Sequence, residues 1–295
     1  MNYTDACIFT GDRVITKAYA KINLTLDVVG RRKDGYHNLE TIMQSISLFD
    51  LVIIDRMESE IKITTNVKYL PTNNKNIAYK AADLFFKETG IRSGAKILLH
   101  KNIPVGAGLA GGSTDAAAVL VGLNRLYGNP LNQKKLLMLG ARIGADVPFC
   151  MIGGTALATG IGEKLEHLNN VSGLHVLVVK PKFGVSTELA YKSYDEAEDS
   201  IIERPNTEAM LRAIEKGNIK EISKNISNVF EKVVGRKYPI IRGIKSTMCN
   251  HGALAAEMSG SGSAVFGIFS SSNKADECAK LFYPDFDEVY TVTTL

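Results

Sequence analysis

Pro104-Val-Gly-Ala-Gly-Leu-Ala-Gly-Gly-Ser-Thr-Asp-Ala-Ala-Ala118 is the stretch around which the rest of the chain is arranged. Four of its glycines fall close together: Gly106, Gly108, Gly111 and Gly112. Glycine has no Cβ atom, so backbone N–H groups in such a loop can approach a ligand closely. The run from Asp115 to Tyr127 has apolar residues at near-helical spacing and predicts a helix capped by Ser113 or Thr114. Because the start of a helix attracts anions, the stretch predicts an anion site, with phosphate as the favoured anion.

Other interpretations of this stretch fit less well. No Gly-Lys-Ser/Thr closes it, so it is not a Walker loop. Its Gly-x-Gly-x-x-Gly letters match a dinucleotide motif, but Ile103-Pro104 precedes them and no acidic residue follows about 20 positions on after a second strand. A flexible loop before a buried helix is the remaining alternative. Against it, the glycines stand between the strand-like Lys96-Ile-Leu-Leu99 and a strongly apolar helix.

Length and composition indicate a globular protein of ordinary kind. With 295 residues the chain exceeds the usual size of one domain, so two domains are expected. Apolar residues make up 45% and charged residues 22%, which is typical of globular domains. The net charge of +4 is too small and scattered to indicate nucleic-acid binding, although it suits an anionic substrate.

Cysteine usage and the N-terminus predict a cytoplasmic protein. The four cysteines lie far apart with no C-x-x-C, which fits reduced thiols rather than a disulfide or zinc framework. Residues Met1 to Arg13 lack the apolar core of a signal peptide, and no run approaches about 18 apolar residues. We therefore expect no membrane partner.

The order of strands and helices predicts an α+β fold. In the first half, Val14 to Val29 is typical of a strand, a turn and a second strand. Further strands and helices are expected there over 48–55, 61–65, 77–87, 94–100, 115–127 and 132–143. In the second half we expect a strand over 174–180, helices over 188–194, 207–216, 219–230 and 239–249, two strands within 253–269, a helix over 272–281 and a strand over 288–293. This order suggests a split α+β sandwich. We place the boundary near Leu165 to Gly173.

Several polar residues stand where they could carry chemistry. Lys21 and Asn23 project to the same side of a strand, as functional side chains or as a solvated strand face. Tyr36-His37 follows a basic glycine turn and could stack on and hydrogen-bond a planar ring, or could be a partly buried aromatic beside a surface histidine. Asp146 lies between glycine and proline, either as a turn former or as a base that takes a proton from a hydroxyl.

Three blocks, taken in order, resemble the three motifs of the GHMP kinases, the superfamily of galactokinase, homoserine kinase and mevalonate kinase. They are Lys21-Ile-Asn23 with Gly35-Tyr-His37, Pro104 to Asp115, and Met258-Ser-Gly-Ser-Gly-Ser-Ala-Val-Phe266. Gly144-Ala-Asp-Val-Pro-Phe149 adds to the similarity, which runs essentially end to end. Each motif alone is moderately specific, and their order and spacing make the resemblance strong.

The resemblance implies a two-domain GHMP kinase fold. Residues 1–168 would form an N-terminal domain with a left-handed β-α-β crossover, and residues 169–295 a ferredoxin-like C-terminal domain that closes over the substrate. It implies ATP-dependent phosphorylation, with Mg²⁺, of the tertiary 2-hydroxyl of a methylerythritol that carries a cytidine diphosphate group, in the non-mevalonate isoprenoid pathway. No protein ligand for the metal is predicted. The protein would be a monomer or a weak homodimer.

The resemblance also assigns roles to residues. Asp146 matches the catalytic aspartate that accepts the hydroxyl proton, and Lys21 the catalytic lysine that holds it ionised and stabilises charge near the γ-phosphate. Asn23 would orient the hydroxyl. Residues expected to bind the cytidine are Tyr36, His37, Thr187 and Tyr191. Met43 stands where relatives often carry an aromatic that sandwiches the cytosine, although methionine can also pack on a ring.

The ATP side of the site follows from the same resemblance. The loop residues expected to wrap the phosphates are Pro104, Val105, Gly106, Ala107, Gly108, Leu109, Ala110, Gly111, Gly112, Ser113 and Thr114. Asn76 and Lys101 are adenine-side candidates, and Met258 to Ser263 would press backbone onto the diphosphate region. Two rival functions remain: another kinase of the superfamily that acts on homoserine, mevalonate or a sugar, and a non-catalytic nucleotide- or RNA-binding module. The Gly35-Tyr-His37 motif argues against the first, and the low net charge without a basic-aromatic stripe argues against the second.

Overall fold

The computed structural model describes residues 7–197 and 203–295, which form two compact units interleaved along the chain. Of the described residues, the first unit contains 7–20, 48–103 and 110–153. The second contains 21–47, 104–109, 154–197 and 203–295. These units do not coincide with a division at residues 168 and 169, and that division stays a prediction.

Two long strands each pass from one unit into the other. Strand β2 is Arg13–Arg31 and strand β3 is His37–Met57. The expected turn within 14–29 was wrong, because the alternating burial of β2 continues without interruption through Ala18 and Ala20. Strand β3 begins at His37, whereas this strand was expected to begin at Leu48. Polar residues in the first half of β3 are buried, so their polarity does not mark a loop.

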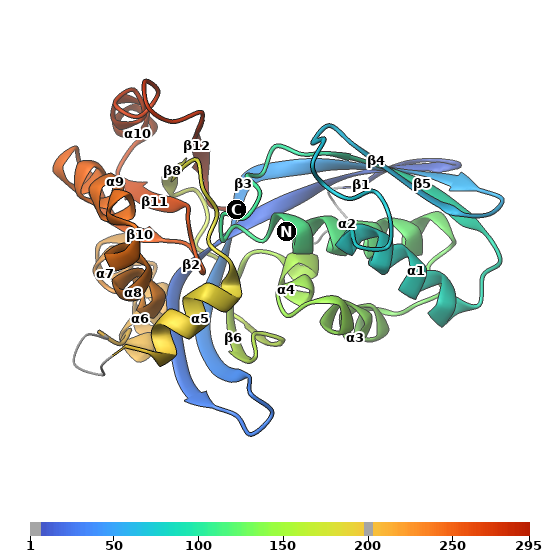
Figure 1. The fold of residues 1–295 in the computed structure, drawn as a ribbon, viewed down its shortest axis with the longest axis horizontal. Coiled ribbons are helices and arrows are strands. Elements are labelled where there is room, and N and C mark those ends of the chain that lie inside the picture. The colour runs from blue at the N-terminus through green and yellow to red at the C-terminus, as the bar shows by residue number, and fades with distance from the viewer. Residues whose placement is uncertain (1–6, 198–202) are drawn as a thin grey trace. The chain divides into compact units, whose positions relative to one another are not determined.

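The first unit combines strand pairs with a crossover connection. Strand β1 (Cys7–Thr10) pairs antiparallel with the start of β2, and β5 (Gly94–His100) pairs antiparallel with the end of β3. Strand β4 (Ile61–Thr65) runs parallel to β5 and is joined to it through α1 (Ile77–Thr89). Figure 1 shows α1 and α2 on one face of β4 and β5. The expected positions of β4, α1 and β5 are confirmed.

Helices of the first unit largely follow the expected ranges. Asn76 caps α1, and the buried residues of this helix are Ala78, Ala81, Ala82 and Phe85. Helix α3 is Gln133–Ile143 with Asn132 as its cap. Helix α4 (Val147–Ile152) was not expected and begins directly after Asp146. Its Pro148 stands in the first helical turn, where proline is tolerated, so proline there does not signal a loop.

The helix after the glycine loop begins earlier than expected. Helix α2 spans Gly111–Leu126, and its N-cap is Ala110 in the left-handed region at φ 59° with no side-chain cap. The prediction that Ser113 or Thr114 caps it was therefore wrong. The Thr114 hydroxyl instead donates a hydrogen bond at 2.7 Å to the carbonyl of Tyr19, which ties the first turn of α2 to β2.

The second unit contains an antiparallel sheet of split β-α-β type. Its strands are β8 (His175–Lys180), β10 (Ala253–Met258), β11 (Val265–Phe269) and β12 (Glu288–Thr293). The hydrogen-bonded order is β10-β11-β8-β12, and all three pairings are antiparallel. In chain order this is second, third, first, fourth, so the ferredoxin-like topology expected for this part is confirmed.

Helices of the second unit contribute many of the buried residues of its core. They are α5 (Thr187–Asp195), α6 (Thr207–Glu215), α7 (Ile219–Lys224), α8 (Val229–Lys237), α9 (Pro239–Asn250) and α10 (Ser272–Ala279). The single helix expected over 219–230 was wrong. The chain leaves α7, and β9 (Ser227–Asn228) pairs parallel with Thr25 and Leu26 of β2. Asn228 then caps α8, because its side chain accepts from the Phe230 N–H.

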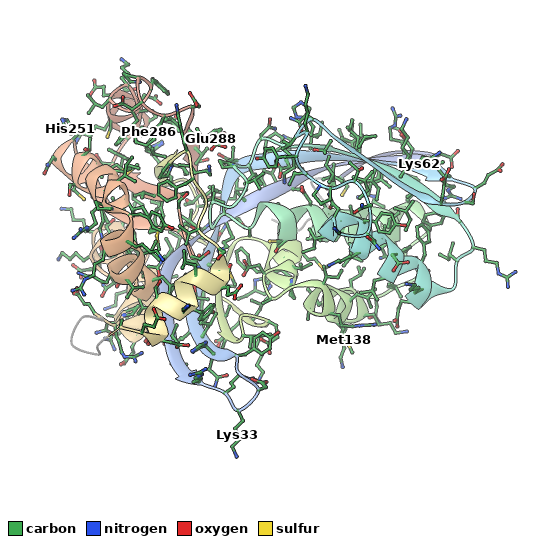
Figure 2. The ribbon with its side chains drawn as sticks, viewed as in Figure 1. Lys33, Lys62, Met138, His251, Phe286 and Glu288 are labelled. Carbon is green, nitrogen blue, oxygen red and sulfur yellow. The ribbon has the colours of Figure 1, made fainter. Side chains whose placement is uncertain are left out.

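The remaining strands of the second unit extend the sheet that contains β2 and β3. Strand β6 (Thr155–Gly160) pairs antiparallel with β3, and β7 (Lys164–His167) pairs with β6. Residues 32–36 connect β2 to β3 and are exposed, and Lys33 points outward from the tip of this connection (Figure 2). Among the described residues, no helix is both long and apolar enough to cross a membrane.

Candidate active site

Two glycine turns meet in the second unit. One is Pro104–Leu109, and the other connects β10 to β11 over 259–264. Gly108 has φ +75°, and a Cβ atom on it would lie 2.0 Å from the Ser259 carbonyl oxygen. The Ser259 hydroxyl donates to the Gly108 carbonyl at 3.0 Å. A side chain at position 108 is excluded by backbone alone, so the close approach of the two turns depends on glycine there.

Further contacts fix the same two turns. The Ala264 N–H donates to the Ala107 carbonyl at 3.1 Å, and the Lys21 N–H donates to the Leu109 carbonyl at 3.2 Å. A Cβ atom on Gly184 would lie 3.0 Å from the Gly106 carbonyl oxygen. Backbone from three separate parts of the chain is therefore packed around the glycine loop. Such loops expose backbone N–H groups and suit phosphate oxygens.

Lys21 brings a buried cation to these turns. The residue is only 4% exposed, and the ammonium donates a 2.7 Å hydrogen bond to Asn23 Oδ1. A Cβ atom on Gly260 would lie 3.4 Å from Lys21 Nζ, so the ammonium lies against the second turn. The expectation that Lys21 and Asn23 project to the same side is confirmed. A buried ammonium next to glycine backbone can stabilise the charge of a phosphoryl group.

The Asn23 amide is held in one orientation. Its Nδ2 donates to Thr41 Oγ1 at 2.8 Å, and the Thr41 hydroxyl donates to the Thr25 carbonyl at 2.6 Å. Because Thr41 gives its proton to that carbonyl, it can only accept from Asn23. The carbonyl end of Asn23 is therefore left facing Lys21, which fixes the position of the ammonium.

The residues expected to bind a cytosine ring are also in the second unit. His37 is 8% exposed and stacks on Tyr191 with ring centroids 4.9 Å apart and an angle of 17°. Tyr36, by contrast, is 62% exposed. Thr187, at the start of α5, has its hydroxyl 3.5 Å from that of Ser261. The structure thus brings His37 and Tyr191 together, and links Thr187 to the second glycine turn.

Sequence reasoning missed Asp195, whose carboxylate lies 2.8 Å from His37 Nε2. Asp195 lay outside the helix expected over 188–194, whereas in the structure Thr187, Tyr191 and Asp195 follow one another at intervals of four on α5. Two of the three were predicted from the resemblance. The third completes the same face of α5.

An anchor holds the C-terminal part of α5 to the end of β2. The Tyr194 hydroxyl donates to the Val28 carbonyl at 3.3 Å, and the Arg204 guanidinium contacts Asp27 at 2.9 Å and the Val28 carbonyl at 2.8 Å. Burial raises the pKa of Asp27, and the charge of Arg204 opposes that rise. The helix that carries Tyr191 and Asp195 therefore has a defined position within the second unit.

In the first unit, a buried ion cluster supports the start of α2. Lys101 Nζ contacts Asp50 Oδ2, lies 2.5 Å from Asp115 Oδ2, and donates to the Gly111 carbonyl at 3.1 Å. Asp50 Oδ1 also accepts from the N–H groups of Asn102 and Ile103. The Lys101 side chain therefore links β3 to the first turn of α2, and its role beside adenine stays a prediction.

Asp115 has an unusual acidity. Burial raises its pKa to about 8, with the nearby Asp50 adding to the rise and Lys101 opposing it. Burial alone would lower the pKa of Lys101, but the charges of Asp115 and Asp50 raise it. At neutral pH Asp115 is therefore mostly protonated.

Asp146 also lies in the first unit, as the N-cap residue of α4. A Cβ atom on Gly144, two residues before it, would lie 4.0 Å from the hydroxyl of Ser113. The turn that carries Asp146 therefore lies beside the first turn of α2. This places the expected base near the helix end that follows the glycine loop.

Two other predicted residues are engaged in the structure. Asn76 accepts from the Ala78 N–H at 2.9 Å and donates to the Pro71 carbonyl at 2.7 Å, so its side chain serves the start of α1. Met43 is fully buried in β3. An adenine contact by Asn76 stays a prediction.

The donor set for a metal ion is sparse. Among the described residues, no group of three or more histidines, cysteines, aspartates or glutamates could hold one. Asp115 is a poor ligand, because its carboxyl is buried against the ammonium of Lys101. Mg²⁺ favours carboxylates together with substrate phosphates, so these residues do not provide a site for it by themselves.

Comparisons with known proteins agree with this architecture. The family model described as "GHMP kinases N terminal domain" matches residues 76–154, and the model "GHMP kinases C terminal" matches residues 210–280. A protein of Caldicellulosiruptor saccharolyticus named 4-diphosphocytidyl-2-C-methyl-D-erythritol kinase is 50% identical over 282 residues, which are 95% of this chain and 97% of the relative.

Solved structures show the same relationship. A crystal structure of 4-(cytidine 5′-diphospho)-2C-methyl-D-erythritol kinase has a TM-score of 0.81 and 34% identity, and the match covers 95% of this chain and 98% of that one. A homoserine kinase from Cytophaga hutchinsonii has a TM-score of 0.76 over 98% of this chain and 96% of that one. At 19% identity, this second likeness concerns the fold alone.

Proposed function

Because the chain belongs to the GHMP kinase family, we propose that it transfers the γ-phosphoryl group of ATP to the 2-hydroxyl of 4-diphosphocytidyl-2-C-methyl-D-erythritol. Relatives with that name, matched along almost their whole length, support this substrate. The observation that carries the proposal is the buried Lys21 ammonium, held by Asn23 against the paired glycine turns. A buried cation beside exposed backbone N–H groups is suited to phosphoryl transfer, which depends on positioning and charge stabilisation.

The donor side of the site is built from the glycine loop. ATP supplies the phosphoryl group, and the backbone of 104–109 and 259–263 would hold its phosphates. The close packing of Gly108 on Ser259 supports this role, because a Cβ atom would fill the space between the turns. Any Mg²⁺ would arrive with the ATP phosphates, and no step is assigned to it.

Two residues would carry the chemistry. Asp146 accepts the proton of the 2-hydroxyl as the oxygen–phosphorus bond forms, while the bond from phosphorus to the ADP oxygen breaks. Lys21 stabilises the negative charge on the transferred group. Asn23 orients the hydroxyl. The position of Asp146 beside the first turn of α2 supports its assignment.

The acceptor side would read the cytidine. The stacked rings of His37 and Tyr191 offer aromatic surface, and Tyr36, the residue before His37, is exposed. Thr187 would close over the sugar or diphosphate from the start of α5. The partner is a small molecule with a cytidine diphosphate group, in a cytoplasmic protein that acts as a monomer or a weak homodimer.

A substrate panel tests this function. Purified protein is given ATP and Mg²⁺ with each of four alcohols in turn: the cytidyl diphosphate methylerythritol, homoserine, mevalonate and galactose. We expect ADP release to rise only with the first. A rise with another alcohol and none with the first would assign the chain to a different kinase of the family. ATP-independent RNA binding, without transfer to any alcohol, would favour a binding module.

The variant Asp146→Asn supplies the control. General-base help contributes about 10²–10⁴-fold, so its turnover should drop by at least about 10²-fold while ATP binding stays measurable. Near-normal turnover in this variant would remove Asp146 from the mechanism.

A further inference from the structure

We propose that Asp195 is a positioning residue that fixes the tautomer of His37, and thereby selects cytosine over uracil in the acceptor. The inference rests on the proposed function, because it takes the cytidine end of the substrate as the ligand of His37. It adds a residue, Asp195, to which neither the resemblance nor the comparisons assign a role.

The first step is the geometry of the pair. Asp195 Oδ1 lies 2.8 Å from His37 Nε2, and an ionised carboxylate can only accept a hydrogen bond. Nε2 therefore carries the ring proton. In a neutral imidazole the other nitrogen, Nδ1, is then an acceptor.

The second step is what remains open on His37. Tyr191 stacks on one face of the ring, and Tyr194 meets it edge-on at a centroid distance of 6.4 Å. Stacking occupies a face and leaves the edge of the ring, so Nδ1 can still bond in the ring plane. Within 7–197 and 203–295, no residue takes Nδ1 as a hydrogen-bond partner.

The third step is the chemistry of the base. Cytosine carries an exocyclic amino group, which donates, where uracil carries a carbonyl, which only accepts. If Nδ1 is an acceptor, it can accept a hydrogen bond from the cytosine amino group. With uracil, the same nitrogen would face the lone pairs of a carbonyl oxygen and could form no hydrogen bond. Removing one partner of a buried hydrogen bond typically changes affinity by about 10–100-fold, so one nitrogen can carry substantial discrimination.

The position of Asp195 in α5 argues against a purely structural role. It is the last residue of the helix, where the helix dipole favours cations and disfavours an acidic side chain. Its side chain is 31% exposed. Asp195 is therefore an acidic residue at an unfavourable position in its own helix. Its contact with the His37 ring, which is expected to meet the base, best explains why an acidic residue stands there.

The test combines a spectroscopic and a kinetic measurement on the full-length protein. Nitrogen-15 NMR of the His37 ring, assigned with a His37→Asn variant, reports which nitrogen is protonated. We expect a protonated Nε2 and a bare Nδ1 in the wild type, and a mixture of tautomers in Asp195→Asn. The ratio of kcat/KM for the cytidine substrate over its uridine analogue should be at least about 10²-fold in the wild type and at least about tenfold lower in Asp195→Asn.

The control is Glu196→Gln, one residue further on, whose side chain is exposed and lies 3.9 Å from Lys192. It should change neither the spectrum nor the ratio. An unchanged ratio in Asp195→Asn, or a wild type protonated at Nδ1, would overturn the proposal.

Failure of the proposed function gives a different result. If the wild type phosphorylates neither substrate, calorimetric binding of CDP and of UDP still decides the inference. Preference for CDP that falls in Asp195→Asn supports it, and equal binding of CDP and UDP by the wild type contradicts it.

Discussion

Asp115 couples the stability of the protein to pH. One of its carboxyl oxygens lies against Lys101, and the other is buried without a hydrogen-bond partner among the described residues. Burial raises its pKa to about 8, whereas an aspartate in the unfolded chain titrates near about 3.9. Between these values the folded state holds a proton that the unfolded state has lost, so the free energy of unfolding decreases as pH rises.

We therefore expect Asp115→Asn to remove this dependence. Between about pH 6 and about pH 8, the free energy of unfolding of the wild type, measured with urea, should decrease by up to about 1.4 kcal/mol per pH unit because of this one group. As pH rises, the free energy of unfolding of the variant should therefore increase relative to that of the wild type. Glu257, whose pKa burial raises to about 7, is in the other unit and contributes equally to both proteins.

Asp83→Asn is the matched control, because Asp83 lies on the exposed side of α1 in an ion pair with Lys87. It should follow the wild type at every pH. A constant difference between Asp115→Asn and the wild type across this range would show that Asp115 does not hold the extra proton.

At the scale of elements, the packing of the two glycine turns is the feature most sensitive to a single substitution. Gly108→Ala places a Cβ atom on the Ser259 carbonyl and adds the cost of the left-handed region, about 1–2 kcal/mol. We expect ATP binding, measured by calorimetry, to weaken at least about tenfold as the turns separate.

Gly217→Ala isolates the contact from the backbone strain. Gly217 has φ +60° in the same unit, but a Cβ atom there meets nothing within 4 Å. Both variants carry similar strain, and only Gly108→Ala carries the clash. Equal ATP affinity in the two variants would mean that the approach of Gly108 to Ser259 does not shape the site.

Local patterns predicted most elements and missed those that depend on distant contacts. Side-chain spacing predicted the helix over 77–87, which is α1 in the structure, and the phosphate-binding role of the glycines in 104–112 stays a prediction. The start of α2 could not be predicted, because Lys101, ten residues before the helix, donates a hydrogen bond to the Gly111 carbonyl. The strand predicted over 48–55 was shorter than β3, because polar residues such as Gln44 and Thr41 interrupt the alternation of apolar and polar residues. In the structure both residues are buried.

The candidate site shows the same division. Resemblance supplied Lys21, His37 and Tyr191, and the structure supplied the contacts between them and their neighbours. Asp195 lies 158 positions from His37, and a single sequence contains no signal that joins positions so far apart. Its spacing from Tyr191 placed it on the same helix face, but only the fold identifies its partner.

At the scale of the whole molecule, the proposed function draws on both compact units. Lys21 and the cytidine-side residues belong to the second unit, and Asp146 belongs to the first. GHMP kinase models match segments of the chain on either side of residue 168. A kinase that acts on a cytidyl diphosphate alcohol accounts for the glycine turns, the buried lysine and the His37–Tyr191 pair together.

Phosphorus-31 NMR of the reaction product tests this account most directly. Protein, ATP, Mg²⁺ and the cytidyl diphosphate methylerythritol are incubated, and the new phosphomonoester signal is recorded without proton decoupling. The 2-hydroxyl is tertiary, so its carbon carries no hydrogen, and the account predicts an unsplit signal that grows in step with ADP. A signal split by hydrogens on the carbon that bears the phosphate, or ADP with inorganic phosphate alone, would contradict it.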